Sequence, residues 1–266
     1  MGGGKSKMLK LLVLSTLFYM LTNYILFHSV VTEESSFPWW KNLATIVLFN
    51  VNPFAYHLWY LSAYIYVLLF IYGIKRYNLW RLAYLTVPIL LIVGIVYGKY
   101  SNLLFQREFY NFFTRNFLFV GLPFYLIGHF IARHKKRFLL HKGRLIYVLS
   151  TLLFTILAIV EGLWVNKIFG DIYICTAFLS VSIFLLTLSC RVEREGVISR
   201  IGRKDTLYIY ITHLFWIKAM SLLMTNASER WLELYRMTGP LVILIISLST
   251  IKLVEFIRFT YTFYQK

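Results

Sequence analysis

The chain is poor in charge and in cysteine. Only 15% of its 266 residues are charged, whereas 59% are hydrophobic. Its 2 cysteines, Cys175 and Cys190, lie in or at the end of one apolar run, too close along a helix to bridge. Neither a disulfide framework nor a cysteine metal site is therefore indicated. The apolar residues form runs of roughly 20 residues between short basic loops, which is typical of a polytopic α-helical membrane protein and not of a soluble domain.

Acidic residues are scarce as well. The chain has 11 Asp and Glu against 28 Lys and Arg, a formal net charge of +17. The cations are spread over alternate loops, and no basic helix or recognition motif collects them, which argues against a nucleic-acid partner. Contact with anionic membrane lipid explains them better.

Motifs of soluble enzymes are also missing. The sequence has no metal-ligand signature, no glycine-rich phosphate loop and no serine elbow. Membrane enzymes often use none of these, so their absence excludes little. We expect no metal cofactor.

The apolar runs predict an all-α, polytopic transmembrane bundle of about eight spans. The expected spans are 8–28, 55–73, 79–98, 109–131, 144–164, 172–189, 206–224 and 240–257. A further apolar segment, 43–49, is too short to cross a membrane and predicts a re-entrant or interfacial piece. With no soluble linker and no internal repeat, residues 1–266 are predicted to form a single membrane-embedded domain.

The distribution of Lys and Arg predicts the orientation of the bundle. Alternate connections are basic, and the others carry few cations or balance them with acids. The basic ones are the amino terminus, 75–81, 133–144, 191–204 and the tail at Arg258. About eight spans with both termini in the cytoplasm satisfy this pattern.

The stretch 201–213 holds the most informative side chains. It places Thr206, Tyr210 and His213 at positions i, i+4 and i+7, on one face of an apolar helix. His213 would lie about 10 Å below the cytoplasmic edge. A polar ionisable group at such a depth suggests a functional site. A neutral histidine that hydrogen-bonds a neighbouring helix is an equally good explanation.

An aromatic cluster opens the predicted second span. His57 stands at its outer end, with Trp59 beside it and Tyr60 and Tyr64 following on one face. Flat aromatic surfaces and phenolic hydroxyls suit a carbohydrate ligand. Trp and Tyr are also ordinary residues of the membrane interface, which is the simpler explanation.

Two opposite charges are expected at similar depth. Arg115 lies near the outer end of the predicted fourth span, and Glu161 near the outer end of the fifth. A structural ion pair, or an arginine that reaches the headgroups, is the simpler expectation. A substrate-binding arginine is the alternative.

The fourth predicted span is interrupted. Pro123, with Gly121 and Gly128, breaks the helix near its middle, and such kinks often border cavities. His129 and His134 follow at the basic cytoplasmic end. Phosphate-rich ligands could bind there, although a solvated basic loop is the simpler explanation.

Three stretches together resemble the integral-membrane acyltransferase 3 family. They are His57-Leu-Trp-Tyr-Leu, the segment 119–133 that runs from Phe119 through Pro123 to Arg133, and 201–213. In this order and spacing, the three stretches make a match that covers most of the chain. The resemblance implies a bundle of ten helices that transfers an acyl group, often acetyl from acetyl-CoA, to a carbohydrate or another envelope acceptor across the membrane.

The chain differs from the family pattern at its amino-terminal end. Family members carry an arginine and, some ten residues later, a histidine in their first helix, and that histidine is usually held to be catalytic. This chain begins at the family's third helix, with Lys5–Lys10 where a basic stretch would stand. We therefore expect an amino-terminally truncated member that lacks the first two helices and the usual base.

The resemblance implies roles for the residues singled out above. The chain is predicted to be a multi-pass O-acyltransferase of the bacterial cytoplasmic membrane, with acetyl-CoA or another acyl-CoA as donor. Its expected acceptor is a surface polysaccharide or a lipid-linked glycan. His213 would be the base if it replaces the missing one; otherwise His213 and Tyr210 position the donor. The coenzyme would be held by Arg133, Lys135, Arg203 and Thr206, and the acceptor by His57, Trp59, Tyr60, Arg115 and Glu161.

Two other functions fit the same features. Broken helices and polar groups near the midplane also serve transporters, so a flippase for a glycan intermediate is the alternative. A folded but inactive scaffold is the third hypothesis. Binding of acyl-CoA separates the enzyme from both.

Overall fold

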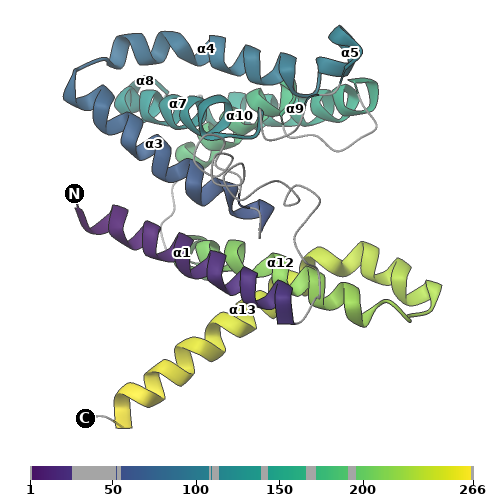
Figure 1. Ribbon diagram of the computed structural model, residues 1–266. Helices are drawn as coiled ribbons and strands as arrows, with labels where there is room; N and C mark the ends of the chain where they lie inside the picture. Colours follow the sequence, from purple (N-terminus) through teal and green to yellow (C-terminus); the bar gives the residue numbers. More distant parts are fainter. Residues whose placement is uncertain are drawn as a thin grey trace. The chain divides into compact units, whose positions relative to one another are not determined.

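A computed structural model describes residues 2–25, 52, 55–107, 109, 114–138, 143–165, 172–190 and 196–264 (Figure 1). These residues form helices and turns and contain no strand. Among them, 6 helices are long and apolar enough to span a membrane, and Phe117–Arg133 and Ile174–Ser189 are shorter apolar helical stretches. The all-α polytopic class is confirmed, while the number of spans and the side of the termini stay predictions. The predicted re-entrant segment 43–49 lies outside the described residues.

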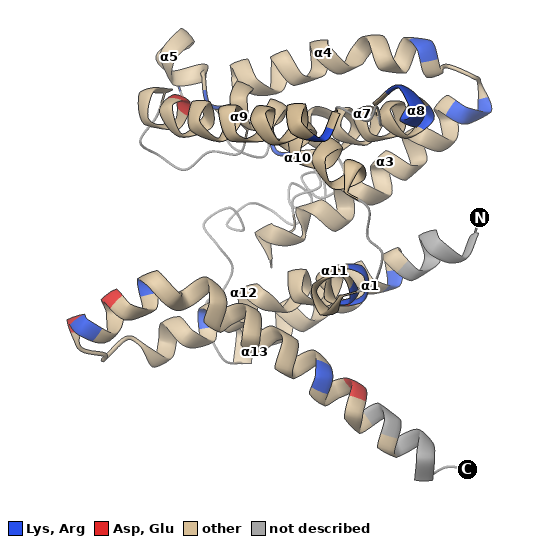
Figure 2. Ribbon diagram, turned by 180° about the vertical axis from the view of Figure 1, so that it is seen from behind, with Lys and Arg blue, Asp and Glu red and all other residues tan. Residues whose placement is uncertain are grey.

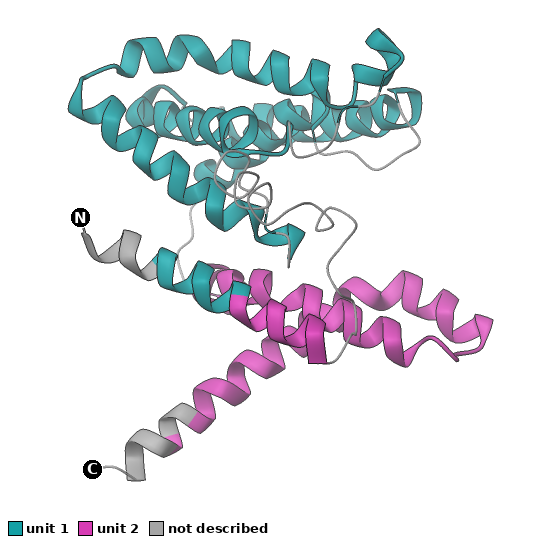
Figure 3. Cartoon of the chain, in the orientation of Figure 1, with its two compact units in different colours: residues 1–16, 31–191 teal, residues 17–30, 192–266 magenta. Residues whose placement is uncertain are grey.

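The chain divides into two compact units (Figure 3). Unit 1 comprises residues 1–16 and 31–191, and unit 2 comprises residues 17–30 and 192–266. Helix α1 (Gly2–Ile25) contributes to both, because its residues up to Thr16 count with unit 1 and those from Leu17 with unit 2.

After its part of α1, unit 1 continues with a helical hairpin. A short 3-10 turn, η2 (Tyr56–Leu58), leads into α3 (Trp59–Arg76), and α4 (Trp80–Tyr97) follows. Asn78 connects these two helices with φ of 53°, a left-handed conformation that asparagine tolerates. The amide of Leu79 donates to the carbonyl of Ile74 at 2.9 Å, which closes the end of α3.

The core of unit 1 lies where this hairpin meets the next helix. A π-helical segment, η3 (Phe117–Gly121), runs directly into α7 (Leu122–Arg133), so the described helix continues through Pro123 and changes its winding just before it. Val67, Ala83, Leu122 and Leu126 form the buried cluster between the helices. A Cβ at Gly121 would lie 3.0 Å from a methyl group of Val67, so a larger residue there would require Val67 to shift.

The remaining helices of unit 1 are α5 (Ser101–Phe105), α8 (Lys135–Phe138), α9 (Gly143–Val165) and α10 (Ile174–Ser189). Helices α9 and α10 pack along each other. Most leucines and isoleucines of α9 are exposed, as expected for side chains that face lipid.

Unit 2 is built on a second hairpin. Helix α11 (Val197–Lys204) is followed by α12 (Thr206–Leu223), and a turn leads into α13 (Glu229–Tyr264). Helix α13 begins at Glu229, earlier than the predicted span 240–257, and continues through Pro240. Proline fits the helical φ angle and removes one hydrogen bond, a loss that membrane helices often tolerate.

Candidate active site

The junction between α11 and α12 is held by a buried acid. Asp205 is 3% exposed, and its carboxylate lies 3.4 Å from the ammonium group of Lys252 on α13. Lys252 also pairs with Glu255 at 2.8 Å. The ammonium group of Lys252 explains why a carboxylate can be buried here, because a buried carboxylate needs a cation nearby.

A tyrosine from α1 enters the hydrogen-bond ladder of α12. Tyr19 is 0% exposed, and its hydroxyl donates to the carbonyl of Ile211 at 2.5 Å. The same hydroxyl accepts from the amide of Phe215 at 3.2 Å. Ile211 and Phe215 are four residues apart, so an ordinary α-helix would join them directly. The Tyr19 hydroxyl thus bridges two main-chain groups on either side of His213.

His213 contacts the main chain of its own helix. Its Nδ1 lies 2.7 Å from the carbonyl oxygen of Tyr210, and a carbonyl oxygen can only accept a hydrogen bond. In a neutral imidazole this contact favours the tautomer with the hydrogen on Nδ1 and the lone pair on Nε2. The ring of Tyr210 lies beside the imidazole, with centroids 5.9 Å apart.

His213 opens onto a groove between α12 and α13, with a volume of about 620 Å³. Aliphatic side chains form most of its wall: Ile209, Ile217, Ile243 and Leu244. The polar side chains of the wall are those of His213, Tyr235 and Arg236. A largely apolar groove with a few convergent polar groups is the usual form of a small-molecule site.

The α13 side of the groove contains Gly239 and Pro240. Because Pro240 has no amide hydrogen, the carbonyl of Arg236 loses its α-helical donor. Gly239 is buried, and a Cβ placed there would lie 3.5 Å from the ring of Tyr235, an ordinary contact. The missing side chain at Gly239 thus leaves space opposite α12.

Two predicted donor-binding residues flank this site in sequence. Arg203 is exposed in the last turn of α11. Thr206 is exposed at the start of α12, and its hydroxyl donates to the carbonyl of Gly202 at 2.6 Å. Thr206 and His213 therefore belong to the same helix, with the threonine hydroxyl turned back to the main chain.

The other predicted residues lie in unit 1. His57 is buried, whereas Tyr60 is 50% exposed. Tyr60 stacks on Tyr64 at 6.5 Å and meets Trp59 edge-on at 6.2 Å. The aromatic cluster of α3 is thus formed by these three rings, while His57 lies in the interior beneath them.

Glu161 has a structural role in unit 1. Its carboxylate accepts the amides of Ile174 at 2.9 Å and Cys175 at 2.7 Å, the first residues of α10. It also accepts the hydroxyl of Tyr100. Burial, together with this bond to the carboxylate, raises the pKa of the Tyr100 phenol above its usual value. These contacts cap α10, as a carboxylate does at a helix amino terminus. Arg115 is half-buried just before η3.

Arg133 and Lys135 lie at the basic end of unit 1. The turn between α3 and α4 and helix α8 occupy the same end and carry most of its cations (Figure 2). The ring of His129 stacks on Trp80 with centroids 4.1 Å apart, and its Nδ1 lies 2.7 Å from the hydroxyl of Tyr84. Cations beside a flat aromatic pair suit a ligand with phosphates and an aromatic base.

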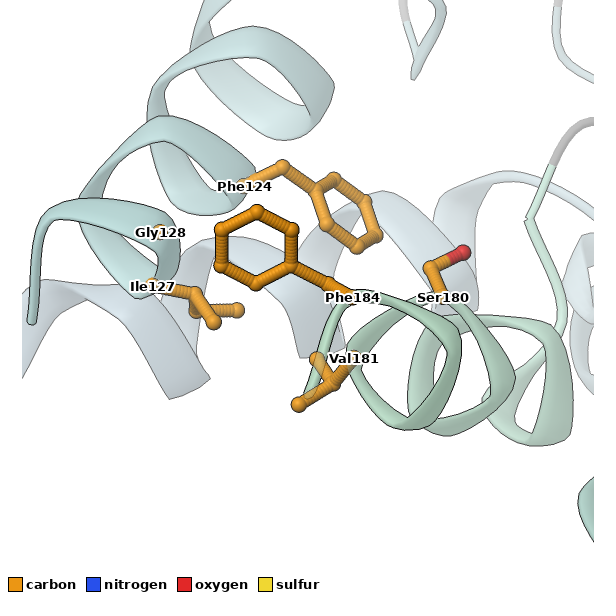
Figure 4. Close-up of a pocket in the computed structure, with 6 residues that line it drawn as sticks. All are labelled: Phe124, Ile127, Gly128, Ser180, Val181 and Phe184. Atoms are coloured by element: carbon orange, nitrogen blue, oxygen red, sulfur yellow. The ribbon is translucent and has the colours of Figure 1, made fainter. Parts of the chain in front are cut away.

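Helices α7 and α10 border a smaller pocket of about 230 Å³ (Figure 4). Phe124, Ile127 and Phe184 line it, and Ser180 brings the one polar side chain among its described lining residues. That hydroxyl donates to the carbonyl of Thr176 at 2.8 Å. The pocket has no group suited to catalysis.

No cluster of three metal-ligating side chains occurs among the residues that the structure describes.

The fold is that of a polytopic helical membrane protein, and the candidate site is a groove lined by His213. A family model described as an acyltransferase domain matches residues 5–254, nearly the whole chain. The chain therefore belongs to the acyltransferase 3 family of membrane acyltransferases. No curated protein and no solved structure matched it.

Sequence reasoning missed two contributors to the site. They are Tyr19, which stands 192 positions before Ile211, and Arg236, which lines the groove. A tyrosine within an apolar run has no special signal. An arginine directly before the apolar run 237–251 does have one, because it marks the membrane boundary.

Proposed function

We propose that the protein transfers an acyl group, acetyl in the simplest case, from acyl-CoA to a hydroxyl group. The acceptor is a surface polysaccharide or a lipid-linked glycan, and the enzyme works in a bacterial cytoplasmic membrane. The observation that carries this proposal is the position of His213, which lines a groove of substrate size and has its Nδ1 2.7 Å from the carbonyl oxygen of Tyr210.

In this proposal His213 is the general base. Nε2 takes the proton of the acceptor hydroxyl as its oxygen attacks the thioester carbonyl. The carbon–sulfur bond then breaks, and the coenzyme A thiolate takes the proton back from the imidazolium. The Nδ1–H bond to Tyr210 stays in place throughout and keeps the ring oriented.

Donor binding is assigned to the cations. Arg133 and Lys135, at the basic end of unit 1, are proposed to hold the coenzyme's phosphates. For Arg203 and Thr206 in unit 2 a role in donor binding stays a prediction from the sequence. Tyr60 and Trp59 offer aromatic faces to the acceptor glycan, and the neighbouring His57 and Arg115 are proposed to support that side. Glu161 would act there indirectly, by fixing α10.

Thermal unfolding of the detergent-solubilised protein tests donor binding. Acetyl-CoA at 100 times its Kd should stabilise the fold by about 2.7 kcal/mol, or roughly 5–10 °C. The double variant Arg133→Gln and Lys135→Gln should lose this shift, and Arg230→Gln at the start of α13 should keep it. A folded wild-type protein without any shift would refute the donor assignment and favour a transporter or a scaffold.

Acyl transfer tests the role of His213. In membranes that contain the protein, His213→Ala should lower acetyl-CoA-dependent thiol release by about 100-fold or more, the usual contribution of a general base. Thr212→Ala is the control, because Thr212 is the neighbour of His213 on α12 and its hydroxyl donates to the carbonyl of Tyr208 in the same helix at 2.9 Å. Equal loss in both variants would contradict the assignment.

A further inference from the structure

The groove between α12 and α13 is much larger than an acetyl group. A dry cavity of about 150 Å³ holds one benzene ring, so a groove of about 620 Å³ has room for roughly four such groups. An acetyl group has two carbons. Most of the groove is therefore available to another part of a substrate.

The groove is long and has one cationic end. Ile209, His213 and Ile217 recur every four residues on α12 and form a stripe about 12 Å long. The hairpin places α13 antiparallel to this stripe (Figure 1). Ile243 therefore lies toward the Ile209 end, and Arg236 lies toward the Ile217 end. This is the form expected of a site for an aliphatic chain with an anionic head.

Arg236 forms the cationic end of the groove. It directly precedes the apolar run 237–251, and its side chain is exposed. Among described residues no carboxylate pairs with it, although Glu233 is only one turn away on the same helix. Arginines at such a boundary lie at the level of the lipid headgroups. The guanidinium group binds phosphate through two parallel hydrogen bonds.

We propose that this groove binds a lipid phosphate. The aliphatic chain packs against Ile209, Ile217 and Ile243, and the phosphate binds Arg236. Arg236 and Gly239 are one turn apart, about 5 Å along the helix axis, so the head of the lipid lies close to His213 on the opposite wall. The proposal rests on the proposed function in one respect, because it selects the lipid-linked acceptor. Binding of the lipid itself needs no acyl donor.

Native mass spectrometry of the full chain in detergent tests the proposal with two single-chain lipids. Oleoyl lysophosphatidate carries the phosphate, and monooleoylglycerol is the same molecule without it. Lysophosphatidate should bind at least tenfold more tightly. Gly239→Leu fills the groove and should weaken this binding tenfold or more. Gly73→Leu on α3, where a Cβ meets nothing within 4 Å, should change it less than twofold.

The headgroup contact has its own pair of variants. Arg236→Gln should remove the preference for lysophosphatidate over monooleoylglycerol, and Arg230→Gln should keep it. If Gly239→Leu does not fold, Ile217→Trp in the groove and Ile245→Trp outside it repeat the comparison, since both isoleucines are at least 41% exposed.

Three results would overturn the proposal. Equal lysophosphatidate binding by Gly239→Leu and Gly73→Leu would assign the lipid to the general protein surface. Equal affinity for both lipids would remove the phosphate contact. Tighter binding of oleate than of lysophosphatidate would make the occupant a fatty acid. Acyl-CoA binding is measured separately, so lipid binding without it would overturn the proposed function alone.

Discussion

Removing the hydroxyl of Tyr19 should destabilise unit 2 at the turn that carries His213. Tyr19→Phe keeps the ring, which is fully buried and packs against Phe18 at 5.3 Å. The change removes only the oxygen that joins the carbonyl of Ile211 to the amide of Phe215. The effect therefore reports hydrogen bonding and not packing.

The expected cost follows from what the two main-chain groups can do next. If α12 closes, they bond to each other, and one hydrogen bond replaces two, a loss of about 1 kcal/mol. If the ring holds the turn open, a buried donor or acceptor stays unsatisfied, at a cost of about 1–3 kcal/mol. We predict a loss of about 1–3 kcal/mol, which corresponds to roughly 2–4 °C in Tm for each kcal/mol.

Thermal unfolding in detergent measures this loss, and amide hydrogen exchange at Phe215 locates it. Tyr24→Phe is the matched control, because Tyr24 lies on the same helix and is 74% exposed. Tyr19→Phe should unfold at a lower temperature than Tyr24→Phe and should change the exchange rate at Phe215. Identical Tm values and exchange rates in the two variants would refute the role of the inserted hydroxyl.

Other consequences concern the charged contacts. Glu161→Gln should cost about 2 kcal/mol, because an amide cannot accept all of the bonds that the carboxylate accepts from Tyr100, Ile174 and Cys175; an unchanged Tm would contradict the capping role. The raised pKa of Tyr100 means that this contact contributes fully at neutral pH and is lost only as the pH rises above about 10. A spectroscopic titration in which Tyr100→Phe removes an ordinary, early-titrating phenol would contradict it. Lys252→Met should lower Tm more than the double variant with Asp205→Asn, since the single change leaves a buried carboxylate without its cation. The opposite order of Tm values would show that Asp205 does not depend on Lys252.

Helix positions were predictable where apolar periodicity was uninterrupted. The expected span 79–98 agrees closely with α4, and 144–164 agrees with α9. The start of α13 at Glu229 was not predictable, because the expected span began at Pro240. Helix interiors in membranes accept proline when neighbouring groups or irregular turns compensate for the lost bond.

The candidate site likewise has features that the sequence predicts and features that it does not. Spacing along one helix correctly placed Tyr210 and His213 within contact of each other. Contacts between helices were not predictable. Examples are the hydrogen bond from Tyr19 of α1 to the main chain of α12, and the shared groove of Arg236 and His213. Glu161 was expected near Arg115, but the partners that the structure gives it include two backbone amides, which leave no trace in side-chain identity.

Transfer of labelled acetyl from acetyl-CoA to lipid-extractable glycan tests the central claim most directly. Membranes that contain the wild-type protein or Thr212→Ala should label this fraction, and His213→Ala should reduce the rate by about 100-fold or more. Labelling by His213→Ala at the wild-type rate would show that the basic Nε2 beside the groove is not the base of the reaction.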